Sequence, residues 1–307
     1  MAEDKNLKAN LTVITVNWYS TEFLEPLFSN LNKKAQWPRK IQYLVIDNTN
    51  SEDKQLSVLK QKNLNLTICP NYPKGEKGSR AHALGLNMAM DKLETEYGLI
   101  VDPDIHIFKT NWDSFCIDII KNQGCSAVGA TYPQWQLGKY HNFPNPVFCF
   151  FKTEDYKKIN ADWTAYSKSP LVNFFNFCRR QILRLGILIN RRRYQKYPAV
   201  RKMFGILEQI IGVCSNDTGS RIASKAKRNN MKAILFKAVL PDDEIIKGKN
   251  DFLISLAEQF ELYSHNKEPI LTHRYGSASK IWKTQKGHDL NFWKQQITNF
   301  ERELSIS

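Results

Sequence analysis

The stretch Tyr97-Gly-Leu-Ile-Val-Asp-Pro-Asp104 decides the fold. A short run without charges is typical of a strand buried in a parallel sheet, and two carboxylates separated by one residue follow it directly. In open α/β sheets, ligands bind beyond the carboxyl ends of the strands. We therefore predict a central strand over residues 97–101 and a ligand site formed in part by Asp102 and Asp104.

Strands and helices alternate ahead of this stretch, with short connections. The pattern predicts an α/β fold with a parallel sheet covered by helices on both faces. Asn17, Asp47 and Asp102 each follow a predicted strand, so three strands are expected to place polar groups at one rim. The predicted strands cover residues 11–16, 41–46 and 64–69, and the predicted helices cover residues 22–31, residues from about 52, and 80–90.

The alternation loosens after a short strand at residues 126–130. Prolines mark loops there, and a further strand is predicted at residues 146–152. A basic, apolar helical segment at 171–213 precedes a helix at 217–230 and a strand at 233–236. Near the C-terminus, apolar side chains at helical spacing predict a helix packed on the body of the protein. They are Leu290, Trp293, Ile297, Phe300 and Leu304.

Composition sets the class of protein. The chain has 307 residues, of which 42% are hydrophobic, and this is typical of a globular protein with a large core. The six cysteines form no Cys-x-x-Cys pair, which favours reduced, mostly buried thiols. Residues 1–10 do not resemble a signal peptide, and the sequence shows no apolar run long enough to span a bilayer. We therefore expect a cytoplasmic protein, with attachment to the inner membrane face left open.

The formal net charge of +14 suggests an anionic partner. More than half of the excess lies in residues 171–213, which contain seven arginines and two lysines but only one acidic residue, Glu208. Aromatic and aliphatic residues alternate with these arginines, so the segment could lie in the interface of an anionic membrane. A helical hairpin packed on the body with a solvated basic face is the alternative.

Several acidic and basic residues could perform chemistry. Asp102 and Asp104 offer hard oxygen ligands for Mg²⁺ or Mn²⁺, which would neutralise a diphosphate leaving group; the alternative is an Asp-Pro turn. Asp47 could accept a hydrogen bond from a nucleoside, or could merely initiate a turn. Arg80 could bind a phosphate at a helix N-terminus, or be a surface arginine. Asp217 could be a general base or a helix N-cap.

Four motifs in the first half resemble glycosyltransferase family 2, whose members have the GT-A fold. They are Thr12-Val-Ile-Thr-Val-Asn-Trp18, Val45-Ile-Asp-Asn48, Gly78-Ser-Arg-Ala-His-Ala-Leu-Gly85 and Leu99-Ile-Val-Asp-Pro-Asp104. In the second half, Asn216-Asp217-Thr218 resembles the acidic acceptor-side motif of that family. The resemblance covers residues 11 to about 240, and the order of the motifs carries it.

The resemblance implies a role for each matching residue. Thr15, Asn17, Asp47 and Asp102 would hold the nucleotide of a donor, and Asp102 and Asp104 would match the metal-binding Asp-x-Asp motif. Asp217 would match the catalytic base of the inverting members. A late histidine completes the metal shell of some GT-A enzymes; His273 could do so here, or be a structural histidine.

The implied enzyme is metal-assisted and inverting. It would transfer a sugar from a UDP- or dTDP-linked donor to a saccharide or lipid-linked saccharide, as in the assembly of bacterial surface polysaccharide or glycolipid. Residues 1–130 would bind the donor and residues 131–307 the acceptor, with a basic insertion at about 164–213 and a C-terminal helix at about 288–304. Asn216 replaces the usual glutamate of the acidic motif. A processive synthase is not favoured, because the sequence contains no Gln-x-x-Arg-Trp motif.

Three other interpretations remain open. A sugar-nucleotide pyrophosphorylase would need a glycine-rich phosphate loop after the first strand, and Asn17-Trp-Tyr-Ser-Thr21 contains no glycine. A nucleic-acid-binding protein is disfavoured, because the charge is concentrated in one apolar segment and no nucleic-acid-binding signature is visible. The third interpretation is a catalytically inactive scaffold with the same fold.

Overall fold

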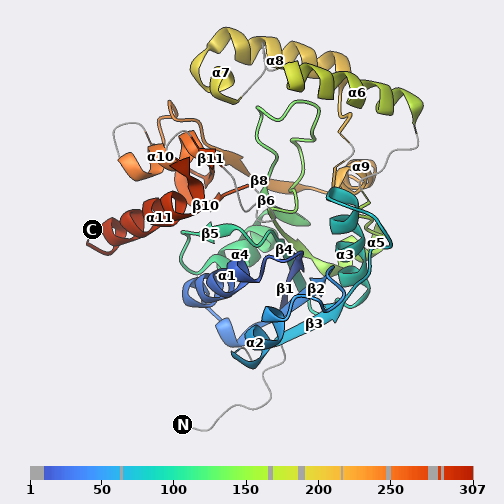
Figure 1. The fold of residues 1–307 in the computed structure, drawn as a ribbon, viewed down its shortest axis with the longest axis vertical. Coiled ribbons are helices and arrows are strands. Elements are labelled where there is room, and N and C mark those ends of the chain that lie inside the picture. Colours follow the sequence, from blue (N-terminus) through green and yellow to red (C-terminus); the bar gives the residue numbers. More distant parts are fainter. Residues whose placement is uncertain are drawn as a thin grey trace.

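The computed structural model describes residues 10–62, 65–164, 169–185, 191–215, 217–246, 250–275, 283–284 and 287–306. It confirms the predicted α/β class: helices flank a central sheet of ten strands (Figure 1). Asn216 and part of the basic segment lie outside the described residues.

The first four strands of the sheet follow the predicted parallel pattern. Their order is β3-β2-β1-β4, and Asn17 at the end of one strand is paired in register with Asp47 at the end of its neighbour. Two residues with positive φ, Asn50 and Ser51, form a turn after the second strand and delay the next helix to Gln55. The elements are β1 (Leu11–Asn17), α1 (Thr21–Lys34), η1 (Pro38–Lys40), β2 (Ile41–Asp47), α2 (Gln55–Lys62), β3 (Leu66–Pro70), α3 (Ser79–Asp91) and β4 (Tyr97–Val101).

The sheet becomes mixed beyond β4. Strand β7 runs antiparallel between β4 and β6, β8 is parallel to β6, and β9, β10 and β5 continue with antiparallel pairing. These elements are β5 (Ile105–Ile107), α4 (Trp112–Gln123), β6 (Ala127–Ala130), β7 (Phe148–Lys152), α5 (Thr153–Lys158), α9 (Ser220–Arg228), β8 (Ala233–Ala238), α10 (Asp251–Gln259), β9 (Glu261–His265) and β10 (Glu268–His273). Short strands β11 (Lys283–Thr284) and β12 (Gly287–His288) precede helix α11 (Asp289–Ile306).

The connection between β4 and β5 forces the sheet to curve. These strands are consecutive in the chain, with only residues 102–104 between them, yet β5 lies at the far edge of the sheet, six positions from β4. A flat sheet would separate them by about 29 Å. The chain from Val101 to Ile105 can span at most about 14 Å. The sheet therefore curls until its last strands return to the carboxyl end of β4.

Two apolar layers cover the sheet. Leu27 and Phe28 of α1, Leu56 of α2 and Ile117 of α4 pack against one face. Helices α3, α5 and α9 contribute Leu86, Tyr156 and Ile222, among others, to a cluster on the opposite face. A third cluster joins α10 and α11 through Leu256, Phe260, Trp293, Ile297 and Phe300. The predicted C-terminal stripe is therefore buried at Trp293, Ile297 and Phe300 and partly buried at Leu290, while Leu304 is 48% exposed.

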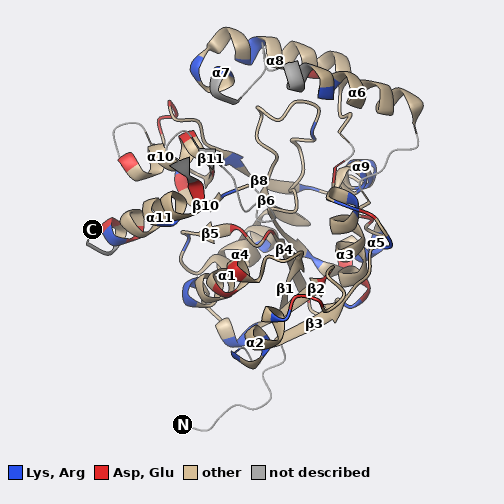
Figure 2. Ribbon diagram, in the orientation of Figure 1, with Lys and Arg blue, Asp and Glu red and all other residues tan. Residues whose placement is uncertain are grey.

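The basic segment is helical, as predicted. It forms α6 (Pro170–Leu185), α7 (Arg191–Lys196) and α8 (Pro198–Ile211), which lie together at one end of the molecule (Figure 1). Lysine and arginine recur along these helices (Figure 2). Among the described residues, no helix is both long enough and apolar enough to cross a bilayer.

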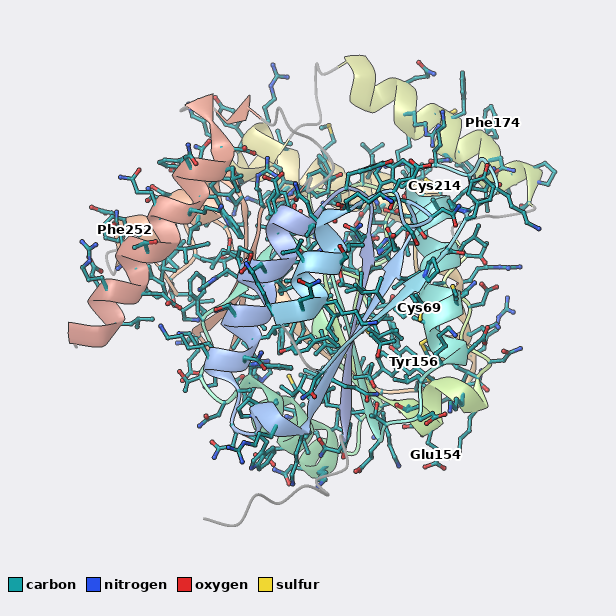
Figure 3. The ribbon with its side chains drawn as sticks, turned by 60° about the horizontal axis from the view of Figure 1, so that its bottom comes forward. Cys69, Glu154, Tyr156, Phe174, Cys214 and Phe252 are labelled. Atoms are coloured by element: carbon teal, nitrogen blue, oxygen red, sulfur yellow. The ribbon has the colours of Figure 1, made fainter. Side chains whose placement is uncertain are left out.

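The six cysteines are free thiols. Figure 3 shows Cys69 and Cys214 in different parts of the fold. Burial raises the pKa of Cys116 well above its usual value and that of Cys149 to about 12, so these thiols are inert packing groups at neutral pH.

The C-terminal helix is tied to the first half of the protein by a partly buried ion cluster. Glu301 Oε1 lies 2.8 Å from Lys34 Nζ and 3.0 Å from His106 Nε2. The hydrogen bond with His106 is the main cause that lowers the pKa of Glu301 to about 2; burial opposes it and Lys34 adds to it. The cluster therefore favours an ionised Glu301 in the folded protein.

Replacing Glu301 with Gln is expected to lower the free energy of unfolding at pH 7 by about 2 kcal/mol. A depressed pKa adds stability above the unfolded value, near 4.5, and this contribution is lost as pH falls toward 2. Urea unfolding between pH 7 and pH 3 measures both effects. The exposed Glu94→Gln is the matched control. A stability difference that does not shrink below pH 4.5 would contradict this role for Glu301.

Candidate active site

A cavity of about 750 Å³ opens at the carboxyl ends of β1, β2 and β4. Its opposite wall comes from residues 132–147 between β6 and β7, from the turn before α9, and from β9 and β10. The volume is large enough for a drug-sized ligand, and pockets of this kind occur at this edge of α/β sheets. The predicted rim is therefore the mouth of a real cavity.

Asp102, Asp104 and His273 converge at the base of this cavity. His273 Nε2 lies 3.4 Å from Asp104 Oδ1 and 3.7 Å from Asp102 Oδ2. The side chain of Asp102 is 24% exposed, while Asp104 is almost fully buried. The curl of the sheet brings them together, because β10 pairs His273 with Ile105, next to Asp104.

Glu261 on β9 orients His273. Its Oε2 lies 2.8 Å from His273 Nδ1, which leaves Nε2 turned toward the aspartates. The other oxygen of Glu261 accepts a hydrogen bond from Gln136, and Tyr263 donates a second bond to Oε2. Burial works against a charged His273, but Asp104 and Glu261 outweigh it and raise its pKa well above the usual value.

Burial is the main cause of the raised pKa of Asp102, with His82 and His273 acting against it. His82 on α3 places Nε2 3.8 Å from Asp102 Oδ1, and burial lowers the pKa of this histidine. Among the described residues, no three His, Cys, Asp or Glu side chains are already arranged as ligands of a metal ion. The donor set of two carboxylates and an imidazole nevertheless suits Mn²⁺, which accepts oxygen and nitrogen ligands.

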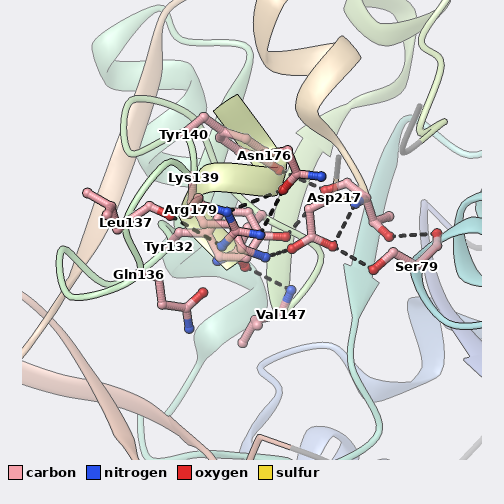
Figure 4. A network of polar contacts seen from close by, with 12 residues as sticks. Ser79, Tyr132, Gln136, Leu137, Lys139, Tyr140, Val147, Asn176, Arg179 and Asp217 are labelled. Carbon is pink, nitrogen blue, oxygen red and sulfur yellow. Dashed lines mark hydrogen bonds and ion pairs between the residues drawn. The ribbon is translucent and has the colours of Figure 1, made fainter. Parts of the chain in front are cut away.

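Asp217 lies on the opposite wall of the cavity and is not a helix N-cap. Helix α9 begins at Ser220 with Gly219 as its N-cap, so the N-cap interpretation is wrong. Asp217 Oδ1 accepts hydrogen bonds from the hydroxyl of Ser79, at 2.7 Å, and from the backbone N–H of Thr218, at 2.9 Å (Figure 4). Its carboxylate is thus fixed in position while it lines the cavity.

The sequence did not reveal Lys139, whose Nζ forms an ion pair with Asp217 Oδ2 (Figure 4). The lysine is 13% exposed and lies over the ring of Tyr132, 4.4 Å from its centroid. Burial, and secondarily Arg179, lower the pKa of Lys139 to about 7, and the charge of Glu261 acts against them. Lys139 lies in a loop without a recognisable motif, so no sequence signal identifies it.

Four residues expected at the nucleotide lie behind the cavity wall or away from it. Thr15 and Asn17 are buried in β1, and Arg80 is 53% exposed, 3.5 Å from Glu76. The fourth, Asp47, accepts hydrogen bonds from the hydroxyl and N–H of Thr49 and from the N–H of Ser51. Its carboxylate organises the turn after β2, as in the turn alternative.

Asn17 joins two carboxylates under this turn. Its side-chain amide donates to Asp47 Oδ1 and Asp53 Oδ2, both at 3.1 Å, and its oxygen accepts from the N–H and hydroxyl of Ser20. These bonds fix the turn whose residues Asn48, Thr49 and Asn50 line the cavity.

Two exposed aromatic residues at the cavity mouth also escaped the sequence analysis. Trp18 follows β1 and is 51% exposed, and Tyr72 follows β3 and is 67% exposed. Both line the cavity. Exposed aromatic faces beside a polar cleft can stack on a planar ring such as a nucleobase. Their position at a strand end was the available signal.

Comparisons with known proteins find solved structures that are similar to about half of the chain. No protein-family model and no curated protein sequence matches the chain. A mannosyltransferase from Pyrobaculum calidifontis, solved with GDP-Man and Mn²⁺, is similar over 53% of this chain, with 16% identity and a TM-score of 0.41. S. aureus TarS, solved with UDP-GlcNAc, is similar over 53% of this chain, with 18% identity and a TM-score of 0.40.

The chain spans about half of each of these structures, 49% and 51% of their respective lengths. With TM-scores of 0.41 and 0.40, these similarities carry no argument about this chain. Its α/β fold is shown by its own ten-stranded sheet.

Asn17→Ala is expected to destabilise the protein by about 2–3 kcal/mol, because it removes the donor between two carboxylates and leaves the buried N–H and hydroxyl of Ser20 without their acceptor. Thermal and urea unfolding would measure the loss. Asn122→Ala, an exposed position at the end of α4, should change stability by less than about 0.5 kcal/mol. Equal effects of the two substitutions would show that Asn17 does not support the turn.

Proposed function

We propose that this protein is a glycosyltransferase that moves a sugar from a nucleotide sugar to an acceptor hydroxyl. One observation carries the proposal: a single cavity has acidic residues suited to a diphosphate-bound cation on one wall and an anchored carboxylate, Asp217, on the other. A transferase needs both, because the leaving group requires charge neutralisation and the attacking hydroxyl requires a base.

The donor nucleotide is proposed to lie at the ends of β1, β2 and β3. Its base would stack on Trp18 or Tyr72, and the exposed side chain of Asn50 offers a hydrogen-bond partner to a base or ribose. A UDP- or dTDP-linked donor suits this polar and aromatic mouth. Asn17 and Asp47 would contribute by supporting these loops, and Thr15 would lie in the strand beneath them. Arg80, exposed at the start of α3, is proposed to contact a phosphate after a side-chain rotation.

A divalent cation, Mn²⁺ or Mg²⁺, is proposed to be held by Asp102, Asp104 and His273. When bound, it would supply charge neutralisation for the departing diphosphate. Glu261 keeps Nε2 of His273 directed at this position, and Asp102 is the most accessible of the three side chains. A buried acidic cluster of this kind carries an electrostatic cost that a cation would relieve.

Asp217 is proposed as the general base. It would take the proton of the acceptor hydroxyl while that oxygen attacks the anomeric carbon, and the bond from this carbon to the diphosphate breaks with its electron pair going to the diphosphate oxygen. Attack opposite the leaving group inverts the configuration. Ser79 and the N–H of Thr218 hold the carboxylate in place, and Lys139 forms an ion pair with its other oxygen.

The acceptor is proposed to be a saccharide or a lipid-linked saccharide, entering along the wall of residues 132–147. Surface polysaccharide or glycolipid assembly is the process that such a reaction would serve.

Two other functions predict different behaviour. An inactive scaffold would bind the donor without transferring its sugar. A nucleic-acid-binding protein is expected to present mainly polar and basic side chains to the phosphates. The basic helices here also expose a broad apolar surface, which disfavours that function.

The cation site is tested by thermal unfolding with UDP and Mn²⁺. At about ten times the dissociation constant, UDP with Mn²⁺ should stabilise the wild type by about 1.4 kcal/mol, or about 2 °C. The near-isosteric Asp104→Asn should abolish the dependence of this shift on Mn²⁺, whereas Asp118→Asn on the exposed face of α4 should preserve it. A shift that is independent of the metal in both proteins would contradict the cation site.

The base is tested separately. Asp217→Asn should retain the UDP-dependent thermal shift, because the amide can still accept the hydrogen bonds of Ser79 and Thr218, but should lower the rate of sugar transfer by about 10²–10⁴-fold. Transfer is followed as nucleoside diphosphate release in the presence of an acceptor mixture. The exposed Asp91→Asn should have wild-type activity. Unchanged transfer by Asp217→Asn would remove Asp217 from the mechanism, and donor binding without transfer by the wild type would favour the scaffold.

A further inference from the structure

Helices α6 and α8 are held to the body by only part of their surfaces. Phe204 of α8 is buried beside Trp135, Leu137 and Tyr194, with Val200, Met203 and Leu207 partly buried around them. On α6, Asn176 is buried and accepts hydrogen bonds from Nε and a terminal nitrogen of Arg179. These contacts leave the other side of each helix facing solvent.

Large apolar side chains project from that other side. On α6 they recur every three residues, and on α8 and just after it they recur at intervals of four and three. Figure 3 shows Phe174 pointing outward from the ribbon. A few isolated exposed apolar residues are normal in a soluble protein, but a concentration on two neighbouring helices is typical of an interaction surface. The outer face comprises Leu171 at 63% exposure, Phe174 and Phe177 at 59%, Ile206 at 50%, Ile210 at 66% and Val213 at 51%.

The charges around the outer face are positive. Arg180, Arg193, Lys196 and Lys202 are exposed on the same three helices (Figure 2). The only acidic residue in the sequence from 170 to 213 is Glu208, which lies 2.8 Å from His141 Nε2. Two carboxylates lie against these helices, and both are paired: Glu208 with His141, and the exposed Asp242 with Arg201, at 2.7 Å.

We propose that the outer face docks on the surface of an anionic lipid bilayer. Amphipathic helices with apolar residues on one side and lysine or arginine at its margin bind in this way, with the apolar groups among the acyl chains and the cations at lipid phosphates. A nucleic acid would satisfy the cations but leave the phenylalanines and isoleucines in water. A second copy would place two basic faces against each other, which like-charge repulsion disfavours.

The docking helices are also in contact with the loop that carries Lys139. The guanidinium of Arg179 donates to the carbonyl of Leu137, at 3.4 Å, and the backbone N–H groups of Cys214 and Ser215 donate to the carbonyl of Gly138, at 3.0 and 2.9 Å. Gly138 has a φ of +74°, and a Cβ there would lie 2.8 Å from Arg179 Cδ. The loop is therefore packed closely against Arg179 of α6 and against the segment that follows α8.

This packing gives the docking surface a consequence for the acceptor. Lys139 directly follows the packed glycine and contacts Asp217, so the helices that would meet the membrane lie next to the wall that carries the proposed base. A hydroxyl of a lipid-linked saccharide could then reach Asp217 without leaving the bilayer surface. Only this consequence rests on the proposed function; docking itself does not.

Co-sedimentation with vesicles tests the docking. The wild type should bind vesicles of equal parts phosphatidylglycerol and phosphatidylcholine at least about tenfold more strongly than vesicles of phosphatidylcholine alone, and salt should weaken this binding. A triple variant, Phe174→Ser with Phe177→Ser and Ile210→Ser, should bind the anionic vesicles at least about tenfold more weakly. Arg180→Glu with Lys202→Glu should lose the preference for the anionic lipid.

The matched control is Val58→Ser with Trp37→Ser, which removes an exposed apolar residue of α2 and one directly before η1. Helix α2 lies on the opposite side of the molecule from α6 and α8 (Figure 1). It should bind vesicles like the wild type. Circular dichroism and the UDP-dependent thermal shift establish that every variant is folded, and an unchanged shift separates a failure of docking from a failure of the proposed activity. Wild-type binding by the triple variant would overturn the proposal. Light scattering that shows a wild-type dimer dissolved by the same substitutions, or RNA binding abolished by the charge reversal without any vesicle binding, would overturn it equally.

Discussion

The three-residue connection from β4 to β5 is the constraint on which the rest of the structure depends. It joins a central strand to the far edge of the same sheet, so the intervening strands must curl around the carboxyl end of β4. The curl sets His273 of β10 beside Asp104 and places Glu261 of β9 behind the histidine. The connecting residues include the acidic pair, Asp102 and Asp104. The same connection that curls the sheet therefore also places these two carboxylates in the site.

The cavity is built in two layers. Side chains that line it come from short loops, and buried polar groups hold those loops in place. Asn17 and Asp47 illustrate the second layer. Asn17 donates hydrogen bonds to Asp47 and Asp53, and Asp47 accepts one from the turn after β2. A buried carboxylate or amide must be fully hydrogen-bonded, and a network that satisfies this requirement is rigid. Such support explains why polar residues at strand ends need not touch a ligand.

The opposite wall depends on segments that are distant in the sequence. The loop of residues 132–147 contributes Lys139, α3 contributes Ser79, and the turn before α9 contributes Asp217 (Figure 4). Helices α6 and α8 brace this wall through Arg179 and the cluster around Phe204. The insertion is therefore part of the site's architecture as well as a candidate membrane surface.

The sequence by itself determined the α/β class, the parallel direction of β1–β4 and the position of Asp102 and Asp104 at a strand end, because hydrophobic periodicity and strand-end chemistry are local properties. It also predicted the helical character of the basic segment. Only the tertiary structure decided which polar residues face the cavity. Asn17 and Asp47 turn inward to satisfy buried partners, while Lys139 and Glu261 reach the site from strands and loops that local patterns do not bring together. The direction of a side chain at a strand end depends on the neighbouring loops and helices. Those neighbours are set by the pairing of strands that are distant in the sequence.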